Sequence, residues 1–294
     1  MAAAEPSPRP VDDRGAVVVT GASSDIGRAT ALHLDSLGFQ VFAGVRKDAD
    51  AESVRAEGSE SLEPLTIDVA DAASIQAAAT TVEQRIGSRG LAGLVNNAGI
   101  VVSGPVEAVP LEGLRRQLEV NVVGQVAVTQ ALLPAIRRAR GRIIFISSVG
   151  GRISLPFMAP YHVSKWGIEA LGDALRQELR PWGIEVVLVE PGSIATPFWQ
   201  KGQEAANDVE RQMNAETQEL YGDQVAAVRD AARKTEAEGI APERVAEVIV
   251  TALTADKPRT RYLVGRDAKI NARIRKLVPD RLFDRLIARE IGLK

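Results

Sequence analysis

A short apolar run, a glycine-bearing turn and a helical segment follow one another near the start of the chain. Residues 16–20 are apolar and β-branched, which is typical of a strand buried on both faces. The turn at 20–27 reads Thr-Gly-Ala-Ser-Ser-Asp-Ile-Gly, and a helical pattern covers 28–37. Because a helix N-terminus offers free N–H groups and the positive end of its dipole, this arrangement predicts a cradle for a pyrophosphate.

Strand patterns and helical patterns alternate along the rest of the chain. The strand patterns cover 40–45, 62–67, 91–96, 142–147, 184–190 and 261–264, and the main helical patterns cover 72–86, 111–138, 161–180 and 243–253. This alternation predicts an α/β fold of the Rossmann type, with a doubly wound, parallel, seven-stranded sheet and helices on both faces. We expect a single domain over 15–266, a disordered arm over 1–14 and a basic helical tail over 267–294.

The composition excludes several classes of function. The 294 residues carry a net charge of −2, which gives no sign of nucleic-acid binding. The chain has no cysteine, so disulfides and thiolate chemistry are excluded, and no cluster has metal-ligand spacing, which predicts a metal-free mechanism. No run of about 18 apolar residues and no signal-like pattern occur, so we expect a cytoplasmic enzyme without a transmembrane segment.

Polar residues and glycines gather where the strand patterns end. Asp68 follows the third strand, Asn97 the fourth and Ser148 the fifth, while Pro191 and Gly192 follow the sixth. In an open parallel sheet, ligands bind beyond the carboxyl ends of the strands. The sequence therefore predicts one binding site along this edge.

Tyr161 and Lys165 stand four residues apart in a helical pattern, which places both side chains on one face. A nearby ammonium favours a phenolate, so we expect Lys165 to lower the pKa of Tyr161. Such a tyrosine gives a proton to a carbonyl oxygen or takes one from an alcohol. The Ser148 hydroxyl, at a strand end, is placed to bond the same oxygen. An isolated Tyr-x-x-x-Lys pair also occurs in ordinary amphipathic helices, so its meaning depends on these surroundings.

Taken together, the motifs resemble those of the short-chain dehydrogenase/reductase family in its compact single-domain form. The resemblance covers about 15–265 and rests on the turn at 20–27, the sequence Asn-Asn-Ala-Gly at 96–99, Asn121, Ser148, Tyr161-x-x-x-Lys165 and Pro191-Gly192, all in the family's order. The run at 37–46 and the C-terminal tail resemble the retinol and hydroxysteroid dehydrogenase branch.

The resemblance implies a role for each matching residue. Tyr161 would be the general acid and base, with Lys165 lowering its pKa and holding the nicotinamide ribose. Ser148 would orient the substrate oxygen, and Asn121 would keep a water that links Lys165 to solvent. Without the resemblance, an asparagine in a long helix would be expected to face solvent or to bend the helix. The implied cofactor contacts are Gly21, Ser23, Ser24, Asp25, Ile26, Gly27, Arg46, Asp68, Val69, Asn97, Ala98, Gly99, Tyr161, Lys165, Pro191, Gly192, Ile194 and Thr196.

Asp25 departs from the family's pattern, which usually has glycine at this position. A side chain there can crowd the turn, and a carboxylate repels a pyrophosphate. An acid at a helix N-terminus is nevertheless favourable, and aspartate tolerates turn geometry. We therefore expect the cofactor to bind, but more weakly than in a glycine form.

The residues after the second strand indicate which nicotinamide cofactor is used. Val45 stands where NAD-preferring members often carry aspartate, and Arg46 can grip the 2′-phosphate of NADP through its guanidinium fork, with a hydroxyl from Ser24. NADP(H) is therefore favoured. NAD(H) remains possible, because Asp48 or Asp50 would serve the ribose hydroxyls in a different register.

The segment at 196–240 resembles the family's substrate lid. Aromatic and apolar side chains here and just before Tyr161 either shape an apolar substrate pocket or cap the core. The candidates are Leu155, Phe157, Met158, Phe198, Trp199 and Tyr221. They suggest a small hydrophobic substrate, an alcohol or ketone of steroid-like, retinoid-like or lipid-like character. The alternatives are a 3-oxoacyl thioester reductase and a nicotinamide-binding redox sensor with little catalysis.

The tail at 267–294 is basic and amphipathic. Such a helix packs on a partner subunit, covers the pocket or lies on a membrane surface, and a packed or solvated helix is the simplest expectation. The resemblance further implies a homo-dimer or homo-tetramer that assembles through the long helices.

Overall fold

The computed structural model describes residues 14–196 and 198–293, without the side chains of 198–203, 205, 232 and 234–237. Seven strands form one sheet in the order β3-β2-β1-β4-β5-β6-β7, and every neighbouring pair is parallel. The predicted doubly wound α/β sheet is therefore confirmed. The strands are β1 (Ala16–Val19), β2 (Gln40–Val45), β3 (Leu62–Thr66), β4 (Leu91–Asn96), β5 (Arg142–Ile146), β6 (Glu185–Pro191) and β7 (Arg261–Val264).

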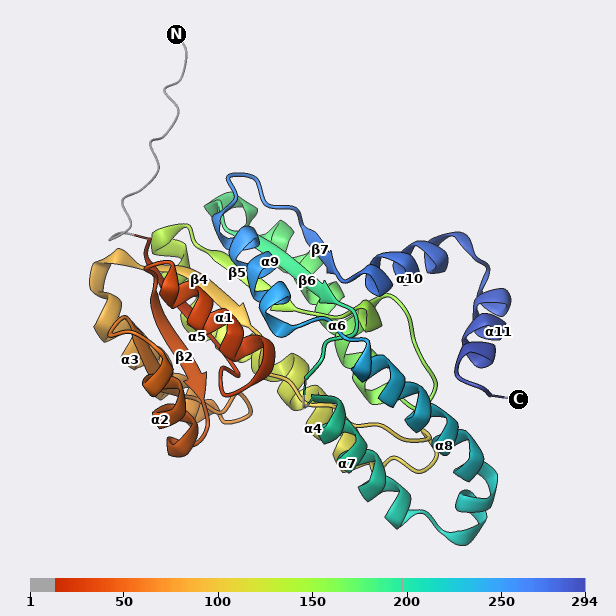
Figure 1. Ribbon diagram of the computed structural model, residues 1–294. Helices are drawn as coiled ribbons and strands as arrows, with labels where there is room; N and C mark the ends of the chain where they lie inside the picture. The colour runs from red at the N-terminus through yellow and green to blue at the C-terminus, as the bar shows by residue number, and fades with distance from the viewer. Residues whose placement is uncertain (1–13, 197, 294) are drawn as a thin grey trace.

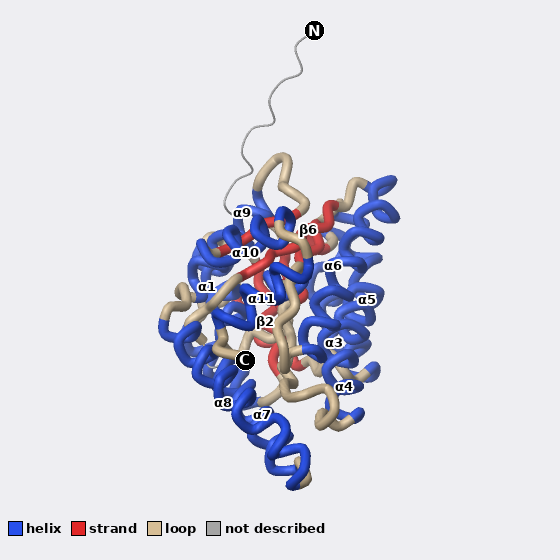
Figure 2. The backbone as a smooth tube through the Cα atoms, turned by 90° about the vertical axis from the view of Figure 1, so that its right-hand side faces the viewer, coloured by secondary structure: helices blue, strands red, loops and turns tan. Residues whose placement is uncertain are grey.

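Helices cover both faces of the sheet, as Figures 1 and 2 show. The helices α1, α2 and α9 pack on one face, and α3, α5 and α6 pack on the other. The α-helices are α1 (Asp25–Ser36), α2 (Asp48–Glu57), α3 (Ala72–Ile86), α4 (Leu111–Leu118), α5 (Gly124–Ala139), α6 (Ala159–Leu179), α7 (Phe198–Gln212), α8 (Ala215–Ala237), α9 (Pro242–Thr254), α10 (Arg266–Leu277) and α11 (Asp280–Glu290). Short turns of helix lie at η2 (Gly87–Arg89), η4 (Val149–Gly151) and η5 (Arg180–Trp182).

Neighbouring residues of each central strand belong to opposite faces of the core. Val18 belongs to the cluster that contains Ile136 of α5 and Ile168 of α6, whereas Val17 belongs to the cluster that contains Leu34 of α1 and Ile249 of α9. Because successive side chains of a strand point to opposite faces, a strand with both faces covered is continuously apolar. This is why the largely apolar runs at 40–45 and 91–96 mark the strands β2 and β4 with their observed bounds, whereas the run at 261–264 marks the half-buried edge strand β7.

Element ends differ from the prediction where local chemistry extends or interrupts a helix. Helix α1 begins at Asp25 rather than Arg28, and α6 begins at Ala159, because Pro160 in its first turn is compatible with a helix start. Helix α2 was not predicted, and its single buried residue, Val54, explains the weak amphipathic signal.

The predicted helix at 111–138 is two helices joined by a turn of π-helix, η3 (Glu119–Val123). Among the described residues, the run Leu111–Ala139 is the one helical stretch long and apolar enough by length and composition to cross a membrane. Half of its apolar window is buried, and Val128, Leu132 and Ile136 pack in the core beneath the sheet. Its apolar character therefore follows from its place in the core.

Two helical pairs extend away from the sheet. Helices α7 and α8 form a hairpin that projects beyond the carboxyl edge, and α10 and α11 continue past the end of β7 on the same side of the sheet (Figure 1). The first pair occupies the segment expected to be the lid, and the second forms the C-terminal tail.

Candidate active site

The glycine turn after β1 is packed against the segment that follows β4. Gly21 has a φ of 66°, and a Cβ on it would lie 2.9 Å from the Cα of Ala98. A Cβ on Gly27 would lie 2.1 Å from the carbonyl oxygen of Gly21. Only glycine allows this backbone conformation and this close packing. The turn and the N-terminus of α1 therefore form a compact backbone cradle at the carboxyl edge.

Asn97 and Thr20 hold this cradle in place. The Asn97 side-chain amide donates to the carbonyl oxygens of Thr20 (3.0 Å) and Gly21 (3.1 Å). In return, the Thr20 hydroxyl accepts from the backbone N–H groups of Asn97 (3.0 Å) and Ala98 (3.1 Å). Asn97 was predicted as a cofactor contact, and the structure shows that its side chain braces the turn.

Asp25 begins α1 in a left-handed conformation, with a φ of 56°. The Ser24 hydroxyl donates to its carboxylate at 2.8 Å. This φ explains why glycine suits the position, since a side chain disfavours the left-handed region. Aspartate is among the residues that tolerate it, so the turn forms despite the departure from the family's pattern.

The ends of β2 and β3 flank the cradle. The N–H of Ala22 donates to the Gly44 carbonyl at 2.8 Å, which ties the turn to β2, and Arg46 is exposed just beyond that strand. Asp48 and Asp50, the alternative ribose contacts, lie in the first turn of α2. Asp68 follows β3, where its carboxylate accepts from the N–H of Ala70 at 2.9 Å.

The structure brings Ser148, Tyr161 and Lys165 together from β5 and α6. Ser148 caps η4, where its hydroxyl accepts from the Gly150 N–H at 3.0 Å, and it also hydrogen-bonds the Tyr161 side chain. The Lys165 ammonium lies 5.6 Å from the centre of the Tyr161 ring and donates to the Ile146 carbonyl at 2.8 Å. The three side chains form a compact polar cluster at the end of β5.

The predicted lowering of the Tyr161 pKa is wrong for this arrangement. Burial raises the pKa of Tyr161 to about 12, and the hydrogen bond from Ser148 opposes this only in part. Burial also lowers the pKa of Lys165 to about 8, and the Glu169 carboxylate opposes that shift. Desolvation is the largest cause of both shifts, because burial disfavours the charged form of each group. Tyr161 is therefore a protonated phenol at neutral pH, and Lys165 carries a charge that titrates near pH 8.

Asn121 lies in the π-helical turn with its side chain buried and bonded to protein groups. Its carboxamide accepts from the Ile100 N–H at 2.8 Å and donates to the Ile100 carbonyl at 3.0 Å. It also donates to the Ser164 hydroxyl at 3.1 Å, and Ser164 donates to the Tyr161 carbonyl at 2.7 Å. The side chain thus joins the loop after β4 to the helix of Tyr161, and a water-holding role for Asn121 stays a prediction.

Two further amides in this region were missed by sequence reasoning. Gln117 is fully buried, and its side chain bonds the Ile100 carbonyl (2.7 Å) and the Val102 N–H (2.6 Å). Gln125 donates to the Ala98 carbonyl at 3.0 Å. The sequence signal that could have found them is a polar residue on an otherwise apolar face of a helix. Such an amide is buried with the face and therefore needs a hydrogen-bond partner.

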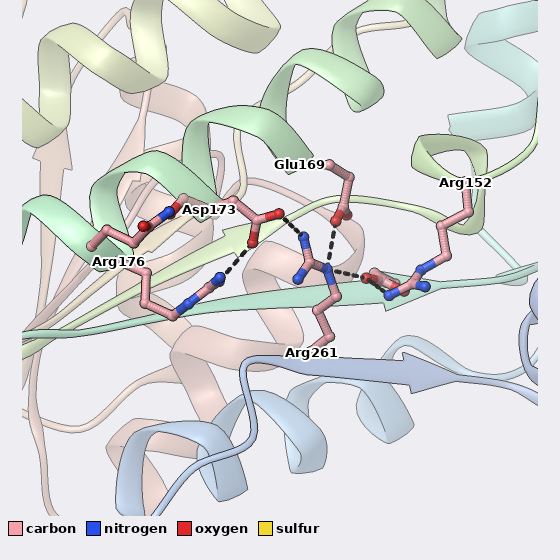
Figure 3. A network of polar contacts seen from close by, with 7 residues as sticks. Arg152, Glu169, Asp173, Arg176 and Arg261 are labelled. Carbon is pink, nitrogen blue, oxygen red and sulfur yellow. Dashed lines mark hydrogen bonds and ion pairs between the residues drawn. The ribbon is translucent and has the colours of Figure 1, made fainter.

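Charged side chains form a network behind the catalytic cluster (Figure 3). Glu190 of β6, whose side chain has no exposed surface, receives two hydrogen bonds from Arg152, one of them at 2.8 Å. Arg261 of β7 lies 3.3 Å from Glu190 and also bonds Glu169 (2.9 Å) and Asp173 (2.8 Å) of α6. The network joins the segment after Ser148, the helix of Lys165 and the strand before Gly192.

The remaining predicted residues lie nearby. Phe157 has a φ of 62°, its carbonyl accepts from the Gly104 N–H at 2.7 Å, and its ring meets that of Tyr221 edge-on at 6.2 Å. Tyr221 comes from α8, and its hydroxyl donates to Glu107 at 2.8 Å. Helix α8, in the segment expected to be the lid, therefore contacts the loop that precedes Tyr161. The side chains of Phe198 and Trp199 lie outside the described residues.

Other predicted contacts occupy the same edge. Leu155 and Met158 are half-buried in the loop before Tyr161, and Ile194 and Thr196 are buried after β6. His162, which was expected to be packed, is buried and lies 2.9 Å from the Gly150 carbonyl through Nδ1.

Comparison with known proteins gives consistent matches. The family model described as short chain dehydrogenase matches residues 15–207. An NADPH-dependent 3-dehydrocapnine reductase of Ornithobacterium rhinotracheale is 37% identical over 93% of this chain and 96% of its own. The 17-beta-hydroxysteroid dehydrogenase type 6 of Bos taurus is 38% identical, covering 93% and 87%, and human retinol dehydrogenase 16 is 39% identical, covering 86% and 81%.

Proposed function

Because the chain belongs to the short-chain dehydrogenase family, we propose that it is an NADP(H)-dependent oxidoreductase that interconverts a hydroxyl and a carbonyl group on a hydrophobic substrate. The observation that carries this proposal is the meeting of Ser148, Tyr161 and Lys165 at the end of β5, beside the glycine cradle. The named activities of the relatives support the same reaction class and place the chain in the retinol and hydroxysteroid branch.

The residues present fit a nicotinamide dinucleotide. The close packing of Gly21 and Gly27 leaves backbone N–H groups and the start of α1 for a pyrophosphate. Exposed Arg46 follows β2 beside this turn, and its guanidinium suits a 2′-phosphate. The NADPH-dependent relative supports the same choice. When bound, the nicotinamide supplies the hydride that moves to or from the substrate carbon.

The protein's own residues handle the proton. At neutral pH the Tyr161 phenol is protonated, so it can donate its proton to the substrate oxygen as a carbonyl becomes an alcohol. The Ser148 hydroxyl, already bonded to Tyr161, would bond the same oxygen and orient it. The Lys165 ammonium, over the ring of Tyr161, would stabilise the phenolate that remains. In the alcohol-oxidising direction the same phenolate takes the proton back.

Re-protonation of Tyr161 needs a route to solvent. We propose that Lys165 passes the proton onward with a water held near Asn121. The support is spatial: Asn121 reaches the helix of Tyr161 and Lys165 through Ser164.

Hydrophobic substrates are supported by the surroundings of Tyr161. Phe157 and Tyr221 place two aromatic rings between α8 and the loop before Tyr161. The relatives named for a hydroxysteroid, for retinol and for 3-dehydrocapnine support a steroid-like, retinoid-like or lipid-like substrate here.

We also propose a cytoplasmic homo-oligomer with a tail able to touch membranes. Three large apolar side chains are half-exposed on η3 and α6, namely Val123, Val163 and Trp166, which suits a helix-to-helix subunit contact. On the tail, Leu277 is 81% exposed, and Leu282 and Leu286 stand beside arginines, which suits weak contact with an anionic membrane surface.

The test is turnover of a panel of hydrophobic ketones and alcohols with NADPH and with NADH, in wild type, Tyr161→Phe, Arg46→Ala and Lys47→Ala. We expect turnover with NADPH, a loss of at least about a hundredfold in Tyr161→Phe, and a weakened NADPH preference in Arg46→Ala but not in Lys47→Ala. Binding of NADPH without any turnover would favour a redox sensor. Turnover restricted to 3-oxoacyl thioesters would favour the thioester reductase.

A further inference from the structure

The C-terminal tail reaches back to the turn that follows β6. The N–H of Ser193 donates to the carboxylate of Asp267 at 2.7 Å, and the N–H of Gly192 donates to the Val264 carbonyl at 2.9 Å. Asp267 lies in the first turn of α10, outside the segment that the sequence assigns to the domain. The end of β7 and the start of α10 therefore bind a turn of the active site directly.

The space around the Asp267 carboxylate is bounded by two glycines. A Cβ on Gly192 would lie 2.3 Å from Oδ2 and 2.4 Å from Oδ1 of Asp267. A Cβ on Gly265 would lie 2.5 Å from Oδ1, and Gly265 has a φ of 105°. Any side chain at either position would displace the carboxylate. The two glycines and the aspartate thus form one packed unit that closes the end of β6.

The opposite side of the turn is held by the end of the lid segment. The Ile240 N–H donates to the Ser193 carbonyl, and the Ala195 N–H donates to the Ile240 carbonyl, both at 3.0 Å. Helix α10 also packs against η4, the segment that Ser148 caps. The turn after β6 is therefore fixed between Ile240 and Asp267, next to the catalytic serine.

We propose that Asp267 is a positioning residue that fixes the Gly192–Ser193 turn for binding of the nicotinamide end of the cofactor. This inference rests on the proposed function, together with the family resemblance, which implies cofactor contacts at Pro191, Gly192 and Ile194 on either side of Ser193. A hydrogen bond from an N–H group to a carboxylate is stronger than one between neutral groups, so it holds the turn in one conformation before the cofactor arrives. A pre-formed site avoids the cost of ordering the turn on binding.

A different role is possible for an aspartate at this place. An acidic residue in the first turn of a helix stabilises the helix by interacting with its dipole. If that were all, loss of Asp267 would lower the stability of α10 and leave cofactor affinity as it was. Cofactor affinity and thermal stability therefore separate the two roles.

The chain offers a matched control. Asp280 lies in the first turn of α11 and bonds Arg275 at 2.7 Å, but it belongs to the outer part of the tail. Asp267→Ala and Asp280→Ala both remove an acid from a helix start. Only the first removes a hydrogen bond to the turn after β6.

The experiment is a fluorescence titration of NADPH into wild type, Asp267→Ala and Asp280→Ala, with melting curves without cofactor and kcat at saturating NADPH. We expect Asp267→Ala to raise the Kd by about tenfold, which is the loss of one charge-assisted hydrogen bond, with kcat changed by less than about threefold. Asp280→Ala should leave the Kd unchanged. An unchanged Kd in Asp267→Ala, or equal changes in both variants, would overturn the proposal.

A second pair of variants covers the case in which Asp267→Ala does not fold. Asp267→Asn keeps the shape and one acceptor oxygen, so we expect a rise in Kd of about threefold. Gly192→Ala should raise the Kd by at least as much, and its effect should shrink when combined with Asp267→Asn, because the two residues contact each other. The proposal would be overturned if Asp267→Asn left the Kd for NADPH unchanged and the double variant showed the sum of the two single effects on the Kd. If wild type itself binds neither NADPH nor NADH, the proposed function fails, and this inference fails with it.

Discussion

The two halves of the carboxyl edge are held together by different chemistry. Beside β1 and β4, the bracing groups are uncharged amides and hydroxyls, chiefly Thr20, Asn97 and Asn121. Beside β5, β6 and β7, they are charged: three arginines, Arg152, Arg176 and Arg261, face three carboxylates, Glu169, Asp173 and Glu190 (Figure 3).

The difference matches what each half is expected to bind. The neutral half forms the cradle for an anionic pyrophosphate, and apart from Asp25 and Arg28 the groups that hold the turn are uncharged. The charged half supports Tyr161 and Lys165, and its equal numbers of opposite charges stabilise one another. The charged half, through Glu169, can therefore influence the charge of Lys165.

The largest effect on stability is expected from removing Glu190, the buried carboxylate between Arg152 and Arg261 in the charged half. Glu190→Ala leaves Arg152 and Arg261 without their buried partner, so we expect unfolding free energy to fall by about 3 kcal/mol, as for other broken buried ion pairs. Urea denaturation at pH 7 measures this. The control is Glu247→Ala, whose partner Arg244 lies on the surface and which should cost less than about 1 kcal/mol. Similar losses of unfolding free energy in Glu190→Ala and Glu247→Ala would show that the buried network contributes no more to stability than a surface ion pair.

Removing a hydrogen bond from the neutral half should lower the unfolding free energy by less and should also weaken cofactor binding. Asn97→Ala leaves the carbonyls of Thr20 and Gly21 without their donor, which we expect to cost about 2 kcal/mol of unfolding free energy and to weaken NADPH binding. Denaturation and cofactor titration measure the two effects. Asn214→Ala, which removes a backbone bond to Thr217 at the start of α8, should reduce stability without changing affinity. An unchanged Kd in Asn97→Ala would mean that the cradle forms without this brace.

The link between the charged half and Lys165 should appear in the pH profile. The pKa of Lys165 is about 8, so carbonyl reduction should decline as pH rises through 8 and the ammonium loses its charge. Glu169 raises this pKa, so Glu169→Gln should move the decline to lower pH. Asp173→Asn is the matched control, because Asp173 shares Arg261 with Glu169 and lies one turn further along α6. If the pH dependence of carbonyl reduction moved equally in both variants, the shift would come from the loss of a partner of Arg261 and not from the charge of Glu169 acting on Lys165.

The smallest effect is expected at Asp25 in the neutral half, where the family usually has glycine. Asp25→Gly relieves a left-handed side chain and removes a carboxylate from the cradle, so we expect NADPH affinity to rise about threefold and stability to change by less than about 1 kcal/mol. Arg140→Gly is the control, since Arg140 is also left-handed, with a φ of 50°, but ends α5. Weaker or unchanged binding in Asp25→Gly would refute the expected repulsion.

Much of the fold could be read from local patterns. The runs at 40–45 and 91–96 matched their strands because a strand covered on both faces is largely apolar, and the run at 261–264 matched the edge strand β7 although that strand is mostly half-buried. The alternation with helices then required a parallel sheet. Helix α2 was not predicted because it buries little, and the π-helical turn at Asn121 was not predicted because the contacts of Asn121 with Ile100 form between segments distant in the sequence.

The sequence by itself determined the strands, the glycine turn and the order of Ser148, Tyr161 and Lys165, because these depend on periodicity and spacing along the chain. Only the tertiary structure decided the protonation states of these residues and the hydrogen bonds and ion pairs around them. The pKa of Tyr161 depends on burial, the partners of Glu190 come from η4 and β7, and Asp267 reaches Ser193 from a segment that the sequence places outside the domain. Burial and long-range contacts arise when distant segments pack, and no local pattern records which partner a polar side chain will meet.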